Sequence, residues 1–210
     1  MRGLWRALLE LLVPSACPAC DAPRVPGQSL LCGSCALRVR RCERLRSVHT
    51  AIAYEGAGLE LVRRFKFEHR SDAGAVLGAW LAERVRELAF DAIVPLPRHL
   101  ARVRSEGCDP VHALARRLAR DTGIRLESRA LRRARLTPPQ TGLSLAARRA
   151  NVAESFAAAP GALSGRRVLL LDDVATTGAT LAEAARALRA GSGAKAVLQV
   201  AVAGTPASVL

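Results

Sequence analysis

Aromatic side chains, lysine and long apolar runs are all scarce in this chain of 210 residues. One Tyr, two Trp and four Phe leave little material for the aromatic platforms on which single-stranded nucleic acids stack. No stretch reaches the roughly 18 apolar residues of a membrane-spanning helix. Half of the residues are nevertheless apolar, so a chain of this length can bury a full α/β core without disulfides.

Acidic residues are also few, and the formal net charge is +14. Nearly all of the positive charge comes from arginine, since Lys66 and Lys195 are the only lysines. Such a chain favours a polyanionic partner, either pyrophosphate or nucleic acid. The alternative is a solvated basic surface, because a GC-rich genome would also enrich the sequence in Arg, Ala, Leu and Val. Composition alone does not decide between the two.

The N-terminal segment has two interpretations. Arg2 and Arg6 precede an apolar stretch that Cys17 follows, which is the order of a lipoprotein signal. Glu10 interrupts this stretch and Pro14 stands where such a signal has Leu, so we predict a short amphipathic helix in a cytoplasmic protein. The apolar residues at helical spacing are Trp5, Leu8, Leu9 and Leu12.

Four of the six cysteines form two Cys-x2-Cys pairs. Each pair places two thiolates on one tight turn, and two turns complete a tetrahedral zinc site with no open position for catalysis. Pro23, Pro26 and Gly27 lie in the short spacer and allow the chain to fold back. A redox pair is the main rival, but zinc is the better assignment in a cytosolic chain. The predicted ligands of a structural Zn²⁺ are Cys17, Cys20, Cys32 and Cys35.

Strand and helix signals alternate beyond this module, which predicts an α/β fold with a parallel sheet. The basic segment from Arg38 to Arg46 is interpreted as a linker, so the expected domains are residues 1–46 and 47–210. Asp109 and Pro110 have the types of an N-cap and a first helical residue. The expected strands cover residues 48–54, 91–97, 168–171 and 195–203, and the expected helices begin near residues 59, 73, 110 and 181.

Residues 168–180 carry the strongest functional signal. The apolar run Val168 to Leu171 predicts a strand buried on both faces, and Asp172 and Asp173 end that run. A turn of Thr, Gly and Ala then leads into a helix, whose first N–H groups can bind a phosphate monoester. The two carboxylates suit a ribose diol or Mg²⁺ attached to that phosphate. The alternative is an ordinary strand–helix turn capped by Thr.

This pattern resembles the signature with which type I phosphoribosyltransferases bind PRPP, the 5-phosphate, 1-pyrophosphate ester of ribose. The resemblance implies that Asp172 and Asp173 are the catalytic pair and hold the ribose 2′- and 3′-hydroxyls, with Mg²⁺ bound alongside PRPP. It implies that the 5′-phosphate is held by Ala175, Thr176, Thr177, Gly178, Ala179 and Thr180.

Nearly the whole chain resembles the ComF family of competence-associated, phosphoribosyltransferase-like proteins. The paired cysteines match, as do Phe-Lys-Phe at residues 65–67, Val-Pro-Leu-Pro at 94–97 and a basic loop around 133–152. The resemblance implies a type I phosphoribosyltransferase-like sheet flanked by helices, a pyrophosphate loop at residues 96–99 and a lid at 133–144. The ligand-binding residues that it implies outside the turn are Leu96, Pro97, Arg98, Arg133 and Gln140.

Two positions depart from what the resemblance implies. Glu106 stands where the family usually has Arg, which questions full transferase activity, and Thr176 stands where purine-salvage relatives have an acid. The expected function is therefore binding of PRPP or a related ribose 5-phosphate ligand in DNA uptake, with phosphoribosyl transfer left open. One alternative is a non-enzymatic competence accessory protein that binds single-stranded DNA and has other DNA-uptake proteins as partners. The other alternative is a PRPP sensor without turnover.

Overall fold

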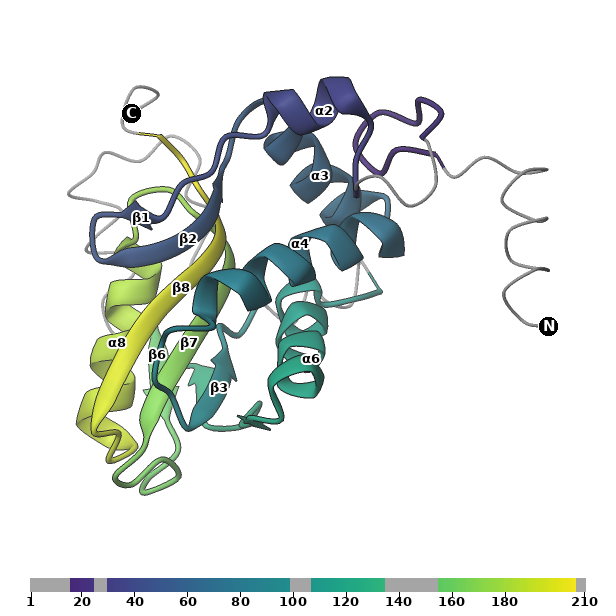
Figure 1. The fold of residues 1–210 in the computed structure, drawn as a ribbon. Coiled ribbons are helices and arrows are strands. Elements are labelled where there is room, and N and C mark those ends of the chain that lie inside the picture. Colours follow the sequence, from purple (N-terminus) through teal and green to yellow (C-terminus); the bar gives the residue numbers. More distant parts are fainter. Residues whose placement is uncertain (1–15, 25–29, 99–106, 135–154, 207–210) are drawn as a thin grey trace, which may run out of the picture.

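The computed structural model describes residues 16–24, 30–98, 107–134 and 155–206 (Figure 1). Several expectations therefore lie outside the described residues. They concern the N-terminal helix, His99, Glu106, Gln140 and most of the basic loop.

A six-stranded sheet in the order β1-β2-β8-β7-β3-β4 forms the centre of the molecule. All neighbouring strands pair in parallel except β1 and β2, which are antiparallel. A second, two-stranded sheet joins β5 and β6. The strands are β1 (Arg44–Leu45), β2 (Val48–Ala53), β3 (Ala92–Pro95), β4 (Arg125–Leu126), β5 (Leu131–Arg133), β6 (Phe156–Ala158), β7 (Arg167–Ala175) and β8 (Ala196–Gly204).

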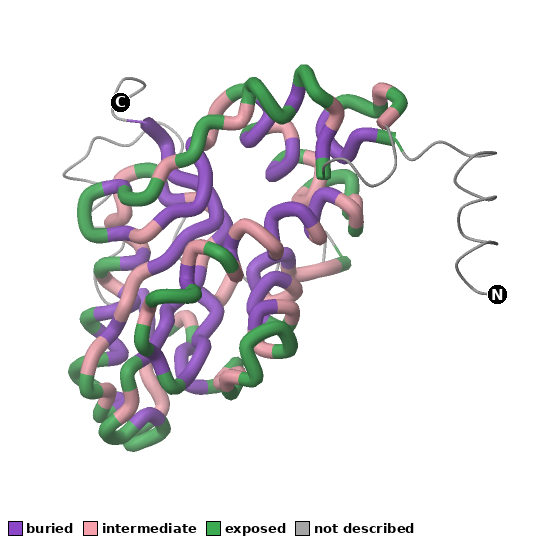
Figure 2. Tube along the Cα trace, in the orientation of Figure 1, coloured by how far each residue is buried: buried purple, intermediate pink, exposed green. Residues whose placement is uncertain are grey.

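Helices cover both faces of the large sheet, as expected for parallel strands. One buried cluster joins α3 (Gly56–Phe67), α4 (Ser71–Val85) and α6 (Pro110–Thr122) to one face, and another joins α8 (Ala179–Gly191) to the opposite face. Successive residues of a strand point to opposite faces, so Leu169 packs in the first cluster and Leu170 in the second. Figure 2 shows the buried core running along the central strands.

The predicted fold class is confirmed, and most predicted elements lie within a few residues of their observed positions. The Asp109 side chain accepts a hydrogen bond from the His112 N–H at 3.1 Å and caps α6, with Pro110 in the first turn. The main difference is in β7. It continues through the acid pair to Ala175, because β8 pairs with it up to Gly204.

The segment with the paired cysteines packs against the large domain. Cys17 and Cys35 are buried in the same cluster as α3 and α4, and the short helix α2 (Gly33–Arg38) starts after Cys32 and contains Cys35. Within the described ranges, no helix combines the length and the apolar character that crossing a bilayer requires.

Candidate functional site

The carboxyl ends of β2, β8, β7 and β3 lie at one edge of the sheet, because these strands are parallel. Ligands of open α/β sheets bind at this edge. Two backbone hydrogen bonds fix the loops there: Leu96 N–H donates to Leu171 O at 2.8 Å, and Thr205 N–H donates to Ala175 O at 2.9 Å. The loops after β3, β7 and β8 are thereby held next to one another.

The acid pair lies near the end of β7, and its two side chains have different partners. Asp173 is only 7% exposed, and its Oδ2 lies 2.9 Å from Nζ of Lys66, near the end of α3. Asp172 is half-buried, and its Oδ1 accepts a hydrogen bond from the Asp173 N–H at 2.8 Å. One carboxylate is thus neutralised by a lysine, whereas the other is held by the backbone.

This asymmetry changes the acidity of Asp172. Burial and then the negative charge of Asp173 raise the pKa of Asp172 from 3.8 to about 7. The Asp173 N–H and the positive charges of Lys66 and Arg133 act in the opposite direction without cancelling the shift. Near neutral pH, a cation or a set of hydroxyl donors at Asp172 would therefore stabilise its carboxylate form and lower its pKa.

The turn between β7 and α8 consists of the predicted small residues, and most of them are at least partly exposed to solvent. Gly178 is the N-cap of α8 with φ of 77°, a left-handed conformation that glycine adopts without strain. Thr176 is exposed, and Thr177 to Thr180 are partly exposed. The Ala179 N–H donates to the Thr177 hydroxyl at 3.3 Å. The start of α8 is accessible to an anion at the same edge as the acid pair.

Arg133 reaches this edge from the small sheet. Its Nε donates to Pro97 O at 3.0 Å, and its guanidinium carbon lies 5.0 Å from the centre of the Phe156 ring. The structure therefore brings Arg133 together with the predicted pyrophosphate loop, of which Pro97 and Arg98 are partly exposed. Its positive charge also acts on Asp172, which connects it to the acid pair.

Two predicted ligand-binding residues are positioned differently from the rest. The side chains of Leu96 and Ala175 are 5% and 3% exposed and belong to the buried cluster under α8. Their side chains pack in the core, so they shape the edge through the backbone. Gln140, the remaining predicted residue, lies outside the described residues.

Sequence reasoning missed three residues at this edge. Lys66 belongs to the Phe-Lys-Phe segment. The signal that could have identified it is its residue type, because almost all other cations of the chain are arginines. Phe156 stacks on Arg133, which no local pattern indicates. The Thr205 hydroxyl, just beyond β8, is buried and has no hydrogen-bond partner among the described residues.

The four predicted metal ligands form a compact cluster. The Sγ atoms of Cys17, Cys20, Cys32 and Cys35 all lie within 4.8 Å of one another, and those of Cys20 and Cys32 are 3.6 Å apart. Tetrahedral zinc, with Zn–S bonds of about 2.3 Å, would separate its sulfurs by roughly 3.8 Å, so the cluster fits this metal. The Cys32 N–H also points to the Cys17 Sγ, at 3.4 Å. None of these thiols forms a disulfide in the described structure.

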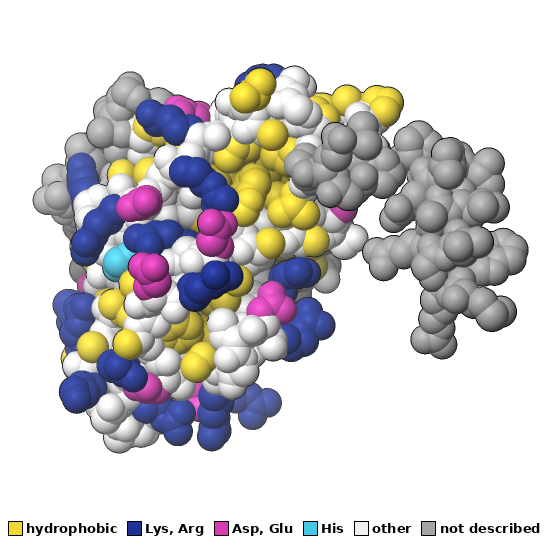
Figure 3. All heavy atoms as spheres, in the orientation of Figure 1, with side chains coloured by type: hydrophobic (Ala, Val, Ile, Leu, Met, Phe, Trp, Pro, Cys, Tyr) yellow, Lys and Arg dark blue, Asp and Glu magenta, His cyan; other side chains and the backbone are white. Residues whose placement is uncertain are grey.

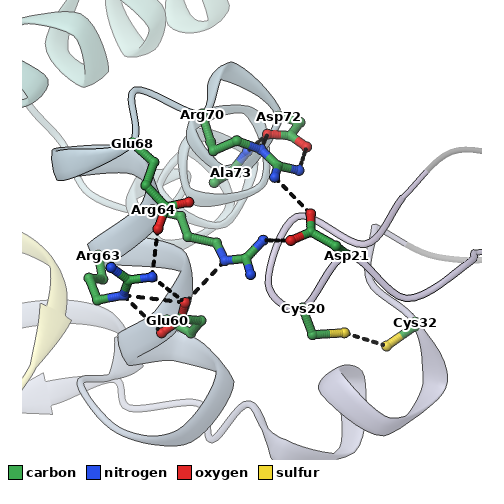
Figure 4. A network of polar contacts seen from close by, with 10 residues as sticks. All are labelled: Cys20, Asp21, Cys32, Glu60, Arg63, Arg64, Glu68, Arg70, Asp72 and Ala73. Atoms are coloured by element: carbon green, nitrogen blue, oxygen red, sulfur yellow. Dashed lines mark hydrogen bonds and ion pairs between the residues drawn. The ribbon is translucent and has the colours of Figure 1, made fainter.

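Ion pairs attach this cluster to the main domain (Figure 4). Asp21, next to the first cysteine pair, accepts hydrogen bonds from Arg64 at 2.6 Å and from Arg70 at 2.7 Å. Glu60 also binds Arg64, and Asp72 also binds Arg70. Because Arg64 and Lys66 lie on the same helix, the cysteine cluster supports the helix that provides the cation for Asp173.

Comparison with known proteins gives consistent matches. Residues 74–207 match the family described as the phosphoribosyl transferase domain. The DNA utilization protein YhgH of Salmonella typhimurium is 32% identical over 181 residues, covering 83% of this chain and 78% of that protein. Competence protein F of Haemophilus influenzae is 33% identical over 138 residues, covering 61% and 60%. A B. subtilis glutamine PRPP amidotransferase structure is similar with a TM-score of 0.43 and 24% identity, over 65% of this chain and 29% of that one.

Proposed function

Because this chain belongs to the ComF family of phosphoribosyltransferase-like proteins, we propose that it binds PRPP or a related ribose 5-phosphate ligand at the carboxyl edge of its sheet. The observation that carries the proposal is the unit formed by β7, the turn and α8. This unit places two carboxylates and an accessible helix N-terminus at one edge. Lys66 on α3 binds Asp173, and the positive charge of Arg133 on β5 acts on Asp172.

The turn is the proposed site of the 5′-phosphate. The first N–H groups of a helix carry partial positive charge, and the threonine hydroxyls at 176, 177 and 180 add further donors. Gly178 has no side chain to obstruct this approach. A Cβ there would already lie 3.2 Å from Val48 Cγ2, so the turn tolerates little extra volume.

The acid pair is the proposed site of the ribose hydroxyls. Asp173 is fixed and neutralised by Lys66, so it can accept a hydroxyl hydrogen without leaving an unpaired buried charge. No cation among the described residues pairs with Asp172, and its raised pKa favours a ligand that brings positive charge or hydrogen-bond donors. Its carboxylate oxygens are the ligand type that Mg²⁺ prefers. When bound, the ion would supply charge neutralisation for the pyrophosphate.

The guanidinium of Arg133 is suited to the pyrophosphate end of the ligand. Its Nε donates to Pro97 O, which places the guanidinium beside the loop after β3, and a guanidinium can bind phosphate oxygens through parallel N–H groups. If the protein is a transferase, the bond from C1 to pyrophosphate breaks, pyrophosphate leaves and an acceptor forms a bond to C1 of the 5-phosphoribosyl group. The described residues would contribute positioning and charge stabilisation, because Thr176 is a poor general base near neutral pH.

The names of the relatives suggest the process in which this site operates. Proteins named for competence and for DNA utilization are similar to most of this chain, so we place it in DNA uptake. The cysteine cluster we assign to a structural Zn²⁺ in an N-terminal module of residues 1–46, attached to a phosphoribosyltransferase-like domain of residues 47–210. Reduced zinc thiolates favour the cytoplasm.

Binding of single-stranded DNA is the second candidate, and the net charge of +14 favours it. The described surface favours it less. On the face in Figure 3, Lys and Arg side chains are spread out and many stand beside acidic ones. Several arginines are in ion pairs, such as Arg41 with Glu83 at 2.9 Å and Arg167 with Asp91 at 2.8 Å. We therefore favour binding of a small phosphorylated ligand over binding of single-stranded DNA.

Melting temperatures measured with PRPP, with and without Mg²⁺, test the proposed function. A ligand of the folded state raises the melting temperature, and Asp173→Asn should remove most of that increase. Pyrophosphate release that depends on an added nucleobase acceptor would show transferase activity, whereas binding without release would indicate a sensor. No effect of PRPP, together with salt-sensitive binding of single-stranded DNA, would reject the proposal in favour of the second candidate.

A further inference from the structure

Cys108 and His69 form a thiol–imidazole contact that the proposed function does not use. The Cys108 Sγ lies 3.0 Å from Nδ1 of His69, although 39 positions separate the two residues in the chain. His69 follows α3 and is exposed, with φ of 54°. Cys108 is half-buried and directly precedes Asp109, the N-cap of α6.

The contact lies at the same edge of the sheet as the candidate site. Lys66, which binds Asp173, is three residues before His69. Three residues span at most about 11 Å. Cys108 is close to the edge from the other side, because the chain segment that contains it leads from the carboxyl end of β3 to α6. The thiol–imidazole pair therefore lies toward the same edge of the sheet as the acid pair.

We propose that Cys108 and His69 are a reactive thiol–imidazole pair, a modification site for hydroperoxides and other soft electrophiles. A thiol reacts as the thiolate, and a neighbouring base that accepts its proton activates it. With its own proton on Nε2, the His69 ring accepts the thiol hydrogen at Nδ1 in the observed geometry. Cys108 is partly exposed and His69 is exposed, which gives a small reagent access to the sulfur.

The reaction with a hydroperoxide balances without another group. The Cys108 sulfur attacks the terminal peroxide oxygen, an S–O bond forms and the O–O bond breaks. The sulfur is oxidised by two electrons to sulfenic acid, and the peroxide is reduced to water or an alcohol, which takes the proton that His69 had received. One external thiol converts the sulfenic acid to a mixed disulfide with loss of water, and a second external thiol reduces that disulfide and releases the Cys108 thiol.

Cys42 is a matched control in the same chain. It is also half-buried, but its Sγ contacts the carbonyl oxygen of Arg44 at 3.8 Å instead of an imidazole. The experiment treats the zinc-loaded full chain with limiting iodoacetamide at pH 7 and follows alkylation of each cysteine by peptide mass spectrometry. An ordinary thiol is only a few per cent ionised at this pH, so Cys108 should react roughly tenfold faster than Cys42.

The variant His69→Asn isolates the imidazole. Asn tolerates positive φ, so the loop is preserved while the base is removed. We expect the Cys108 rate to fall to that of Cys42, and the Cys42 rate to stay unchanged. Hydrogen peroxide followed by dimedone should trap sulfenic acid at Cys108 in the wild type.

Equal rates at the two cysteines in the wild type would overturn the proposal. An unchanged Cys108 rate in a folded His69→Asn protein would do the same. The comparison within the wild-type chain remains decisive even if the variant unfolds, because both cysteines are measured in one sample.

Discussion

Replacing Asp172 by Asn should stabilise the ligand-free protein at neutral pH. The folded-state pKa of Asp172 is raised from 3.8 to about 7 by burial and by the charge of Asp173. Between these values the folded protein holds a proton that the unfolded chain has lost. The free energy of unfolding must therefore fall as pH rises from about 4 to about 7, and stay low above that range.

The size of the effect follows from the shift. Each pKa unit corresponds to about 1.4 kcal/mol, so a shift of about three units would amount to roughly 4 kcal/mol at pH 8. Asp172 keeps part of its surface in solvent, so we expect about half of this value, roughly 2 kcal/mol. Asn retains an oxygen that can accept the Asp173 N–H, and thus removes the charge while keeping the hydrogen bond.

Urea denaturation of the wild type and Asp172→Asn at several pH values between 4.5 and 8.5 measures this difference. The advantage of the variant should grow from pH 4.5 to about 7 and then level off. Asp91→Asn is the matched control, because Arg167 holds the pKa of Asp91 at about 2 and that carboxylate is ionised throughout this range. Parallel pH profiles for the wild type and Asp172→Asn would refute the reasoning.

Three further predictions concern other parts of the molecule. Lys66→Met should lower the free energy of unfolding by about 3 kcal/mol, because it leaves Asp173 buried without its cation. Lys195 is exposed, so the control Lys195→Met should change this free energy by less than about 0.5 kcal/mol. Equal losses of the two variants in urea denaturation would contradict this prediction. Thr205→Val should raise the free energy of unfolding by about 1 kcal/mol in urea denaturation, because it removes a buried hydroxyl without a described partner. A lower free energy of unfolding would show that the hydroxyl is satisfied. Metal analysis should find about one Zn²⁺ per chain. Cys17→Ser should lose the metal, whereas the control Cys42→Ser should keep it. A metal-free wild-type protein with six reactive thiols would exclude the site.

The sequence predicted the elements whose signals are local. The apolar run before Asp172 predicted a strand buried on both faces, and residues 168–171 are fully buried. Asp109 and Pro110 predicted the start of α6, which begins at Pro110. The paired cysteines predicted a cluster that the structure forms. The residues that predict the strand and the helix start are neighbours in the chain. The cysteines are farther apart, but two Cys-x2-Cys pairs are a pattern typical of metal binding.

What the sequence could not predict depends on contacts between distant segments. Lys66 meets Asp173 across 107 positions only because α3 packs over the end of β7. Arg133 reaches Pro97 because β5 pairs with β6 beside α8. The raised pKa of Asp172 likewise needs the burial that the assembled sheet provides. Residue types indicated a phosphate and ribose site, but the neutralisation of one acid and not the other required the tertiary structure.

Calorimetric titration of Mg²⁺·PRPP into the wild type, Gly178→Ala and Gly123→Ala tests the central claim most directly. Both glycines have positive φ at a helix end, 77° and 71°, so both substitutions introduce similar backbone strain. A Cβ at Gly123 has no neighbour within 4 Å among the described atoms, whereas one at Gly178 would lie 3.2 Å from Cγ2 of the buried Val48, so the proposed phosphate turn must shift to admit it. The account predicts binding by the wild type and Gly123→Ala. It predicts at least about a tenfold loss of affinity in Gly178→Ala, because the contact with Val48 displaces the turn and moves its N–H groups away from the phosphate. Equal affinity of the three proteins, or no heat of binding in any of them, would contradict it.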